Sequence, residues 1–304
     1  MGTLQVVATP IGNLEDVTLR ALRVLREADH LYAEDTRRVR TLLHRHGISA
    51  HPISLYSENE EGRVREILEK LGRDETVVLV SDAGTPLISD PGARVVSSAA
   101  RNGHDVEGIP GPSAVLTALS VCGLRTHPFT FVGFLPRKVG ARKKLLETYA
   151  QRAETVVIFE SPNRLAQTLS LLVEVFGGDR PACVARELTK LHEEVVRGDL
   201  EKLAETFSES VRGEITLVVE GSEAVREVSA RVLIEEEEVN RRILQLIQEG
   251  KRPREIAAQL SSISGLPRRE IYARAVSVRE SIGAKDVAKG RSAEVPFKVG
   301  WPSS

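Results

Sequence analysis

The sequence has few cysteines and no long apolar run. Cys122 and Cys183 are its only cysteines, they lie far apart, and no histidines cluster beside them. This spacing argues against a disulfide framework and a structural zinc site, and we expect no metal. No stretch approaches the ~20 apolar residues that cross a bilayer, and the N-terminus lacks a signal-peptide pattern. We therefore predict a cytoplasmic protein with no membrane partner.

Several common catalytic motifs are also missing. The chain has no GxxxxGK[ST] loop, which argues against a P-loop nucleotidase, and no GxGxxG fingerprint of dinucleotide-binding enzymes. A GxSxG nucleophile elbow and an HExxH helix are absent too. A serine triad and a catalytic metal site therefore have no positive support.

The composition is that of an ordinary soluble protein. The chain has 304 residues, of which 41% are hydrophobic, enough for about two domains with their own cores. Its 42 basic and 43 acidic side chains nearly cancel, but the basic ones are clustered locally. The net charge therefore says little about nucleic-acid binding, for which the distribution of charge matters more.

Short apolar runs alternate with amphipathic segments over the first 125 residues. We predict strands at residues 4–8, 30–33, 53–56 and 76–80 and near residue 106. This alternation is typical of a largely parallel sheet covered by helices, and we assign it to a first domain, residues 1–125. Residues 126–222 predict a shorter second α/β domain with a mixed sheet.

The chain changes character after residue 222. We predict a helical domain at residues 223–282, with helices at 239–248, 253–260 and 267–278. Two of these helices are typical of a helix-turn-helix, with Arg268 and Arg269 opening the second one. A plain helical accessory domain is the alternative. The tail, residues 283–304, has little periodicity and is expected to be extended or disordered.

The most informative stretch is residues 76–92. Five apolar or β-branched residues predict a strand buried on both faces, and Asp82 follows directly after it. Asp90 is expected to cap the next helix, with Pro91 at its first position. Ligands bind beyond the carboxyl ends of strands in open α/β sheets, so Asp82 and the flexible Gly84 predict a ligand site. A well-capped structural loop is the alternative.

Further loops follow other apolar strands. They are residues 9–13, 34–38, 110–114, 160–164 and 186–190. Together these loops are expected to line one cleft between the two α/β domains, a favoured place for ligands.

The sequences of these loops resemble those of the tetrapyrrole methylase superfamily, and within it those of the branch that modifies ribosomal RNA. The matching phrases are Val7-Ala-Thr-Pro-Ile-Gly-Asn-Leu14, Ala33-Glu-Asp-Thr-Arg37, Ser81-Asp-Ala-Gly-Thr-Pro-Leu-Ile-Ser-Asp-Pro-Gly92, Pro110-Gly-Pro-Ser-Ala114, Gly133-Phe-Leu-Pro136, Phe159-Glu-Ser-Pro-Asn-Arg164 and Ala185-Arg-Glu-Leu-Thr-Lys190. The resemblance covers about residues 4–221. The loop around Asp82 reads Asp-Ala-Gly rather than the Gly-Asp-Pro of the porphyrin enzymes, which agrees with the RNA branch.

The resemblance implies an α/β fold with a mostly parallel N-terminal sheet and a mixed C-terminal sheet, followed here by the small helical domain. It implies transfer of a methyl group from S-adenosylmethionine to the ribose 2′-hydroxyl of a decoding-region cytidine in small-subunit ribosomal RNA. The implied partner is that RNA within the assembled small subunit, and the implied assembly is a homodimer. A tetrapyrrole C-methyltransferase and a non-catalytic RNA-binding protein are the alternatives.

The resemblance also implies site residues. It places the cofactor against Pro10, Ser81, Asp82, Ala83, Gly84, Ile88, Ser113, Ala114, Phe159 and Glu160. Position along the chain adds Leu188, Glu214, Ile215 and Thr216. Asp35, Glu187 and Lys190 are candidates for a general base, and burial would have to lower the pKa of Lys190. A helix cap or an ion pair is the alternative for each. Basic residues placed to meet RNA phosphates are Arg37, Arg38, Arg137, Lys138 and Arg164, with Arg268 and Arg269 in the helical domain.

Overall fold

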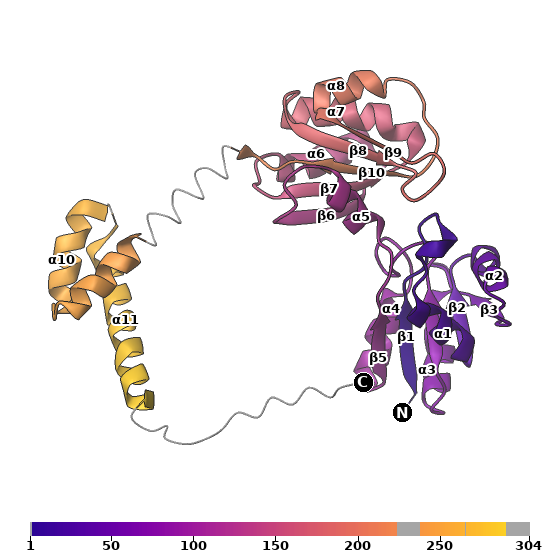
Figure 1. The fold of residues 1–304 in the computed structure, drawn as a ribbon, viewed down its shortest axis with the longest axis horizontal. Coiled ribbons are helices and arrows are strands. Elements are labelled where there is room, and N and C mark those ends of the chain that lie inside the picture. Colours follow the sequence, from indigo (N-terminus) through magenta and orange to yellow (C-terminus); the bar gives the residue numbers. More distant parts are fainter. Residues whose placement is uncertain (1, 224–237, 265, 290–304) are drawn as a thin grey trace. The chain divides into compact units, whose positions relative to one another are not determined.

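The structure, a computed structural model, describes residues 2–223, 238–264 and 266–289 (Figure 1). Contacts between residues divide the chain into two compact units, Met1–Ser222 and Glu223–Ser304. Each unit is described separately below. No helix within the described ranges is long and apolar enough to span a membrane.

The first sheet of the larger unit is parallel throughout. Its strands are β1 (Thr3–Val7), β2 (His30–Ala33), β3 (Pro52–Ser54), β4 (Val77–Val80) and β5 (Asp105–Ile109), in the order β3-β2-β4-β1-β5. The expected five strands and their parallel pairing are confirmed. Because the pairs are parallel, the loops after β1, β2, β4 and β5 all leave from one edge of the sheet.

Helices cover both faces of this sheet, which explains why its central strand is apolar at every position. On one face lie α1 (Leu19–Glu27) and α2 (Thr36–Arg45), packed against Val78 and Val80; the 3-10 turn η1 (Leu14–Asp16) precedes α1. On the other face lie α3 (Glu60–Leu71) and α4 (Ala93–Arg101), packed against Val77 and Leu79.

The start of α4 differs from the sequence prediction. Asp90 does not cap this helix, because the helix begins two residues later with Gly92 at the N-cap, in a left-handed conformation (φ +118°). Glu60 of α3 supplies the acceptor instead: its Oε1 accepts the backbone N–H groups of Gly92 (3.1 Å) and Arg94 (3.0 Å). Because a neighbouring helix satisfies these donors, the carboxyl of Asp90 is available for another role.

The second sheet is mixed, as expected. Its strands are β6 (Phe129–Phe134), β7 (Thr155–Glu160), β8 (Pro181–Arg186), β9 (Glu194–Asp199) and β10 (Ile215–Val219), in the order β6-β7-β10-β8-β9. Strands β6 and β7 are parallel, and the other pairs are antiparallel. One face is covered by α6 (Val139–Ala150), α7 (Leu165–Phe176) and α8 (Leu200–Thr206), with the short turn η2 (Pro162–Arg164) leading into α7.

Helix α5 (Ala114–Val121) covers the opposite face of the second sheet, although it precedes residue 125 in the chain. Its Val115, Ala118 and Leu119 are buried against Val157 and Val218 of the central strands β7 and β10. The same cluster contains Ile11 of the first loop and Leu188. The first loop and α5 therefore belong to a core of the second sheet, and the expected boundary at residue 125 falls after a helix that packs with that sheet.

The smaller unit is helical. A helix covers residues 238–248, followed by α10 (Pro253–Ser264) and α11 (Arg268–Lys289), and the three share a core that includes Ile243, Ile256 and Ile271. The expectation of an extended or disordered tail from Gly283 is wrong as far as Lys289, because α11 continues to that residue. The extension is rich in good helix formers but lacks an apolar stripe, so periodicity did not reveal it. Residues 290–304 lie outside the described residues.

Candidate functional site

The loops after β1 and β4 are joined by backbone hydrogen bonds. Thr9 and Gly84 exchange two N–H···O bonds of 2.9 Å each, and the Thr9 hydroxyl donates to the carbonyl of Ser81 at 3.3 Å. Gly84 has φ +78°, and a Cβ there would lie 3.3 Å from Ile11 Cγ2. A side chain at position 84 would therefore strain the backbone and crowd the first loop, which explains the glycine.

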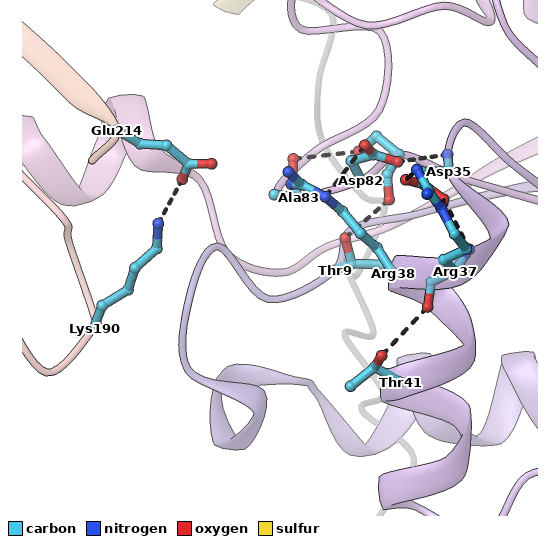
Figure 2. Close-up of polar contacts among 10 residues, drawn as sticks. Thr9, Asp35, Arg37, Arg38, Thr41, Asp82, Ala83, Lys190 and Glu214 are labelled. Carbon is cyan, nitrogen blue, oxygen red and sulfur yellow. Dashed lines mark hydrogen bonds and ion pairs between the residues drawn. The ribbon is translucent and has the colours of Figure 1, made fainter. Parts of the chain in front are cut away.

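Asp82 joins the ends of β2 and β4 (Figure 2). Its Oδ1 accepts the backbone N–H of Asp35 at 2.6 Å, and its Oδ2 lies 3.6 Å from Arg38 Nε. A carboxylate that accepts a backbone N–H and pairs with a guanidinium is held in one orientation. Asp82 therefore fixes two loops at the edge of the first sheet.

These loops form one wall of a pocket of about 410 Å³ in the larger unit. From the first lobe it is lined by Ile11, Glu34, Arg38, Asp82, Ala83, Gly84, Thr85, Ile88, Ser89, Asp90, Ser113 and Ala114. From the second lobe it is lined by Phe134, Phe159, Glu160, Ser161, Pro162, Ala185, Leu188, Gly213, Glu214, Ile215 and Thr216. The loops that follow separate strands in the sequence thus meet around a single cavity.

The pocket contains nearly all of the residues expected to hold the cofactor. The two exceptions are Pro10 and Ser81, which are buried and do not line it. The Ser81 hydroxyl lies 3.3 Å from the carbonyl oxygen of Ala83 and 3.4 Å from that of Gly84, so it shapes the loop from behind. Because these two residues are beneath the surface, we assign them to support of the pocket wall.

Sequence reasoning missed two acidic residues of the pocket, Glu34 and Asp90. Both belong to the loop phrases that carry the family resemblance, so the signal was present. The side chain of Asp90 predicts a helix cap, and the sequence offers Asp35, the neighbour of Glu34, as the candidate base. The aromatic Phe134 was also missed; it is 57% exposed and lies at the end of β6, against Phe159.

The carboxyl groups of the pocket repel one another. Burial, followed by the charges of Asp82 and Asp90, raises the pKa of Glu34 to about 7. Burial also raises the pKa of Asp90 to about 6; a hydrogen bond from Ser81 opposes this rise and the charge of Asp82 adds to it. The pocket therefore contains two carboxyl groups whose pKa values lie near neutral pH, and such shifted values are common at functional sites.

This electrostatic cost predicts how Glu34 affects stability. The folded protein holds the Glu34 proton more tightly than the unfolded chain. The contribution of this proton to the free energy of unfolding is therefore greatest below pH ~4.5 and is lost as pH rises through about 7. We expect Glu34→Gln to stabilise the protein at pH 8 by about 1 kcal/mol after screening, or about 2–4 °C in Tm. Thermal melts at pH 5 and pH 8 measure this, and the gain should shrink at pH 5.

The adjacent Asp35 provides a control of opposite sign. Hydrogen bonds from Arg37 lower the pKa of Asp35 to about 2. Asp35→Asn should therefore reduce stability at pH 8. At this pH the Asp35 carboxylate is ionised in both the folded and the unfolded state, and the substitution removes its charged interaction with Arg37. A gain in Tm for both variants at pH 8 would contradict the electrostatic assignment.

The three predicted general bases are outside the pocket lining. Asp35 caps α2, accepting the N–H of Arg37 at 2.9 Å, and pairs with the Arg37 side chain at 2.8 Å. Lys190 pairs with Glu187 at 2.8 Å and with Glu214 at 3.0 Å. For all three, the structure thus shows the cap or ion pair that was the alternative interpretation.

The lowered pKa that Lys190 would need to act as a base is not found; its pKa is raised. Burial alone would lower it, but the hydrogen bonds to Glu187 and Glu214 outweigh burial and raise it. The same hydrogen bond from Lys190 lowers the pKa of Glu187. Both groups are therefore charged at neutral pH, which makes Lys190 a poor proton acceptor.

Residues 186–190 lie directly against the first loop. The N–H of Asn13 donates to Thr189 Oγ1 at 3.0 Å. A Cβ at Gly12 would lie 2.5 Å from Lys190 Cγ, 2.8 Å from Thr189 Oγ1 and 3.0 Å from the Leu188 carbonyl. The first loop and residues 186–190 can approach this closely only because position 12 is glycine.

We expect Gly12→Ala to displace residues 186–190, because its methyl group has no free space. The cost should be about 1–3 kcal/mol of unfolding free energy, as for other overpacked sites. Urea denaturation measures this. Gly62→Ala, in α3 with no atom within 4 Å of the new Cβ, is the matched control and should be neutral or stabilising. Equal losses in the two variants would contradict the assigned close contact.

The residues expected to meet RNA are dispersed. Arg38 lines the pocket, whereas Arg164 is largely committed to the fold, donating to the carbonyls of Leu135 (2.9 Å) and Pro136 (3.2 Å). Exposed positions are taken by Arg37, Arg137 and Lys138. In the smaller unit, a separate hollow is lined by Arg254, Ala257, Arg268, Arg269 and Tyr272.

The pocket fits a cofactor with an adenine ring, ribose hydroxyls and an ammonium group. Its volume lies within the ~300–1,000 Å³ of small-molecule pockets. Ile11, Ile88, Phe159 and Leu188 offer apolar surface for a ring, and the acidic groups offer acceptors. In the described part of the chain, no group of three or more His, Cys, Asp or Glu side chains is placed to hold a metal ion.

Comparison with known proteins agrees with this geometry. Residues 3–204 match the family described as "Tetrapyrrole (Corrin/Porphyrin) Methylases". The chain belongs to the tetrapyrrole methylase family. Solved structures of this fold include uroporphyrin-III-C-methyltransferase from Thermus thermophilus, with a TM-score of 0.53 and 22% identity over 72% of this chain and 94% of that one. The fold expected for a tetrapyrrole methylase is thereby confirmed.

Curated relatives of this tetrapyrrole methylase carry a narrower name. A protein of Halalkalibacterium halodurans, "Ribosomal RNA small subunit methyltransferase I", is 41% identical over 89% of this chain and 93% of its own length. A protein of the same name from Thermotoga maritima is 45% identical over 73% of this chain and 100% of its own. A third, from Bacillus subtilis, is 40% identical over 90% of this chain.

Proposed function

We propose that this protein is an S-adenosylmethionine-dependent methyltransferase that modifies the ribose 2′-hydroxyl of a decoding-region cytidine in small-subunit ribosomal RNA. The main support for the proposal is the pocket. The loops that line it have sequences that resemble those of the RNA branch. The names and coverage of the curated relatives support the substrate class.

Each wall of the pocket has a part in holding the cofactor. Phe159, Leu188 and Ile215 provide an apolar surface suited to adenine, while the acidic side of the pocket suits hydroxyl and ammonium groups. When bound, S-adenosylmethionine supplies an electrophilic methyl group. The chain's own contribution is to fix the approach of the hydroxyl, because alignment accounts for much of the rate of such a displacement.

The basic side chains suit a polyanionic substrate. Arg38 lines the pocket, and the same unit exposes Arg37 in the first turn of α2 and Arg137 and Lys138 in the loop before α6. In the smaller unit, three arginines line the same hollow as Tyr272, which is 40% exposed, and such a lining suits phosphates beside an unstacked base. We assign this hollow to backbone contact with RNA, without sequence reading.

Methyl transfer from labelled cofactor tests the proposal. Wild-type protein would be incubated in parallel with small ribosomal subunits, free RNA of the same subunit and uroporphyrinogen. We expect label in the RNA of assembled subunits, in a cytidine that becomes resistant to alkaline cleavage on its 3′ side. Label on the tetrapyrrole alone would overturn the proposal, and cofactor binding without any transfer would favour a non-catalytic RNA-binding protein.

We also propose that the protein acts as a homodimer in the cytoplasm. A hollow lined by Leu116, Leu119, Leu124 and Phe129, together with Ser120, Gly123 and Thr126, supports a partner surface, since Leu116 is 59% exposed and Phe129 is 39% exposed. Light scattering at micromolar concentration should give twice the chain mass. Leu116→Glu should shift the mass toward the monomer, and a monomeric wild-type protein would contradict the assignment.

A further inference from the structure

A ribose hydroxyl is a weak nucleophile, and a group that takes its proton adds on the order of 10²–10⁴ to the rate of such a reaction. The carboxylates and the lysine first expected in this role are occupied by ion pairs outside the pocket. If the protein uses a general base, it must come from the groups that line the pocket itself.

Glu34 is placed for this role. It follows directly after β2, at the sheet edge where the cofactor loops meet, and it lines the pocket together with Asp82 and Asp90. Among the residues that the structure describes, none forms a hydrogen bond or an ion pair with the Glu34 side chain. Asp82, by contrast, is held by Asp35 N–H and Arg38. A half-buried carboxyl group without a partner is free to accept a proton from a ligand.

Most of the charged groups near Glu34 raise its pKa. Asp82 and Asp90, from the loop after β4, and Asp35 raise its pKa, and Arg38 of α2 alone opposes them. Glu160 and Glu214 are the charged groups of the pocket's other wall. With the pKa of Glu34 raised to about 7, its carboxyl group is basic enough to take a proton and still largely ionised above neutral pH.

We propose that Glu34 is the general base of the reaction, accepting the proton of the ribose 2′-hydroxyl as the oxygen is methylated. This inference rests on the proposed function. The O–H bond breaks toward Glu34, the new C–O bond forms from the oxygen lone pair, and the C–S bond breaks with its electrons left on sulfur. The products are the 2′-O-methyl ribose, the neutral thioether and protonated Glu34, which loses its proton to water.

Glu34→Gln keeps the shape of the side chain and removes the basic oxygen. We expect single-turnover methylation of small ribosomal subunits to fall on the order of 100-fold or more, with cofactor affinity by calorimetry within about threefold of wild type. The wild-type rate should rise with pH and level off above about 7, and the variant should lose this dependence. Glu61→Gln, an exposed carboxyl at the start of α3, is the matched control and should retain the wild-type rate.

Two measurements separate this role from the alternatives. In protein labelled with 13C at the glutamate carboxyl groups, the Glu34 resonance, identified by its absence in Glu34→Gln, should titrate near pH 7. Asp90→Asn should move this titration and the pH–rate profile to lower pH, since the Asp90 charge raises the Glu34 pKa. An Asp90→Asn profile that does not move would overturn the inference.

Several outcomes contradict the proposal. A wild-type rate in Glu34→Gln, or a Glu34 titration at its ordinary value, would overturn it. A loss of cofactor affinity of tenfold or more in Glu34→Gln would make Glu34 an anchor of the cationic cofactor and overturn its role as a base. Absence of cofactor binding and transfer in the wild-type protein would instead refute the proposed function, and the inference with it.

Discussion

Asp82→Ala is expected to weaken S-adenosylmethionine binding by about 10–100-fold, because it removes the acceptor that holds two pocket loops together. The N–H of Asp35, now bonded to Asp82 Oδ1 at 2.6 Å, would lose its partner. A partly buried donor that loses its acceptor costs on the order of 1–3 kcal/mol, which in a ligand-binding loop appears largely as lost affinity. Isothermal titration calorimetry with the cofactor measures this directly.

Two further variants make the Asp82 experiment specific. Asp82→Asn retains an oxygen that can accept from Asp35 N–H, so its loss should be smaller than that of Asp82→Ala. Asp105→Ala removes an exposed carboxylate at the start of β5, the end of that strand remote from the pocket edge, and should leave affinity unchanged. Equal affinity in Asp82→Ala and wild type would show that the loop around Asp82 does not hold the cofactor.

Glu160→Gln is expected to destabilise the protein by about 3 kcal/mol, because it removes a fully buried carboxylate from its ion pair with the partly exposed Arg164. The Glu160 side chain is 0% exposed, lies 3.3 Å from Arg164 Nε and accepts the Thr168 hydroxyl at 2.6 Å. Thr168 in turn accepts from buried Arg142 at 3.0 Å. Loss of one charge leaves Arg164 without its carboxylate, so Tm should fall by about 6–12 °C in calorimetric scans.

The matched control for Glu160→Gln is an exposed ion pair of the same lobe. Glu174 pairs with Lys143 on the surface, and its side chain is 57% exposed. Glu174→Gln should change stability by less than about 0.5 kcal/mol, since exposed pairs contribute little. If both variants lose the same stability, the buried network around Glu160 does not have the structural role assigned to it.

The sequence predicted the sheets better than the polar interactions. Apolar runs such as residues 77–80 predict a strand buried on both faces, and the alternation with amphipathic helices predicts a largely parallel first sheet, although not the order of its strands. The resemblance in the loops likewise identified the pocket, because loops at one sheet edge must converge. Both inferences depend on local patterns that a sequence records directly.

The roles of individual carboxylates could not be predicted in the same way. Asp90 has the side chain of a helix cap, but Glu60, thirty residues earlier, takes that role across the interface of α3 and α4. Asp35 and Glu34 are adjacent in the chain, yet Asp35 caps a helix and Glu34 lines the cavity. Such assignments depend on partners distant in sequence, which no local pattern contains.

The position of α5 has a consequence for dividing this protein into fragments. A fragment that ends near residue 125 would keep this helix but lose the strands that cover Val115, Ala118 and Leu119. Its apolar face would then meet water, favouring self-association, while the complementary fragment would expose Val157 and Val218. The two lobes are therefore expected to be produced, and to fold, as one piece.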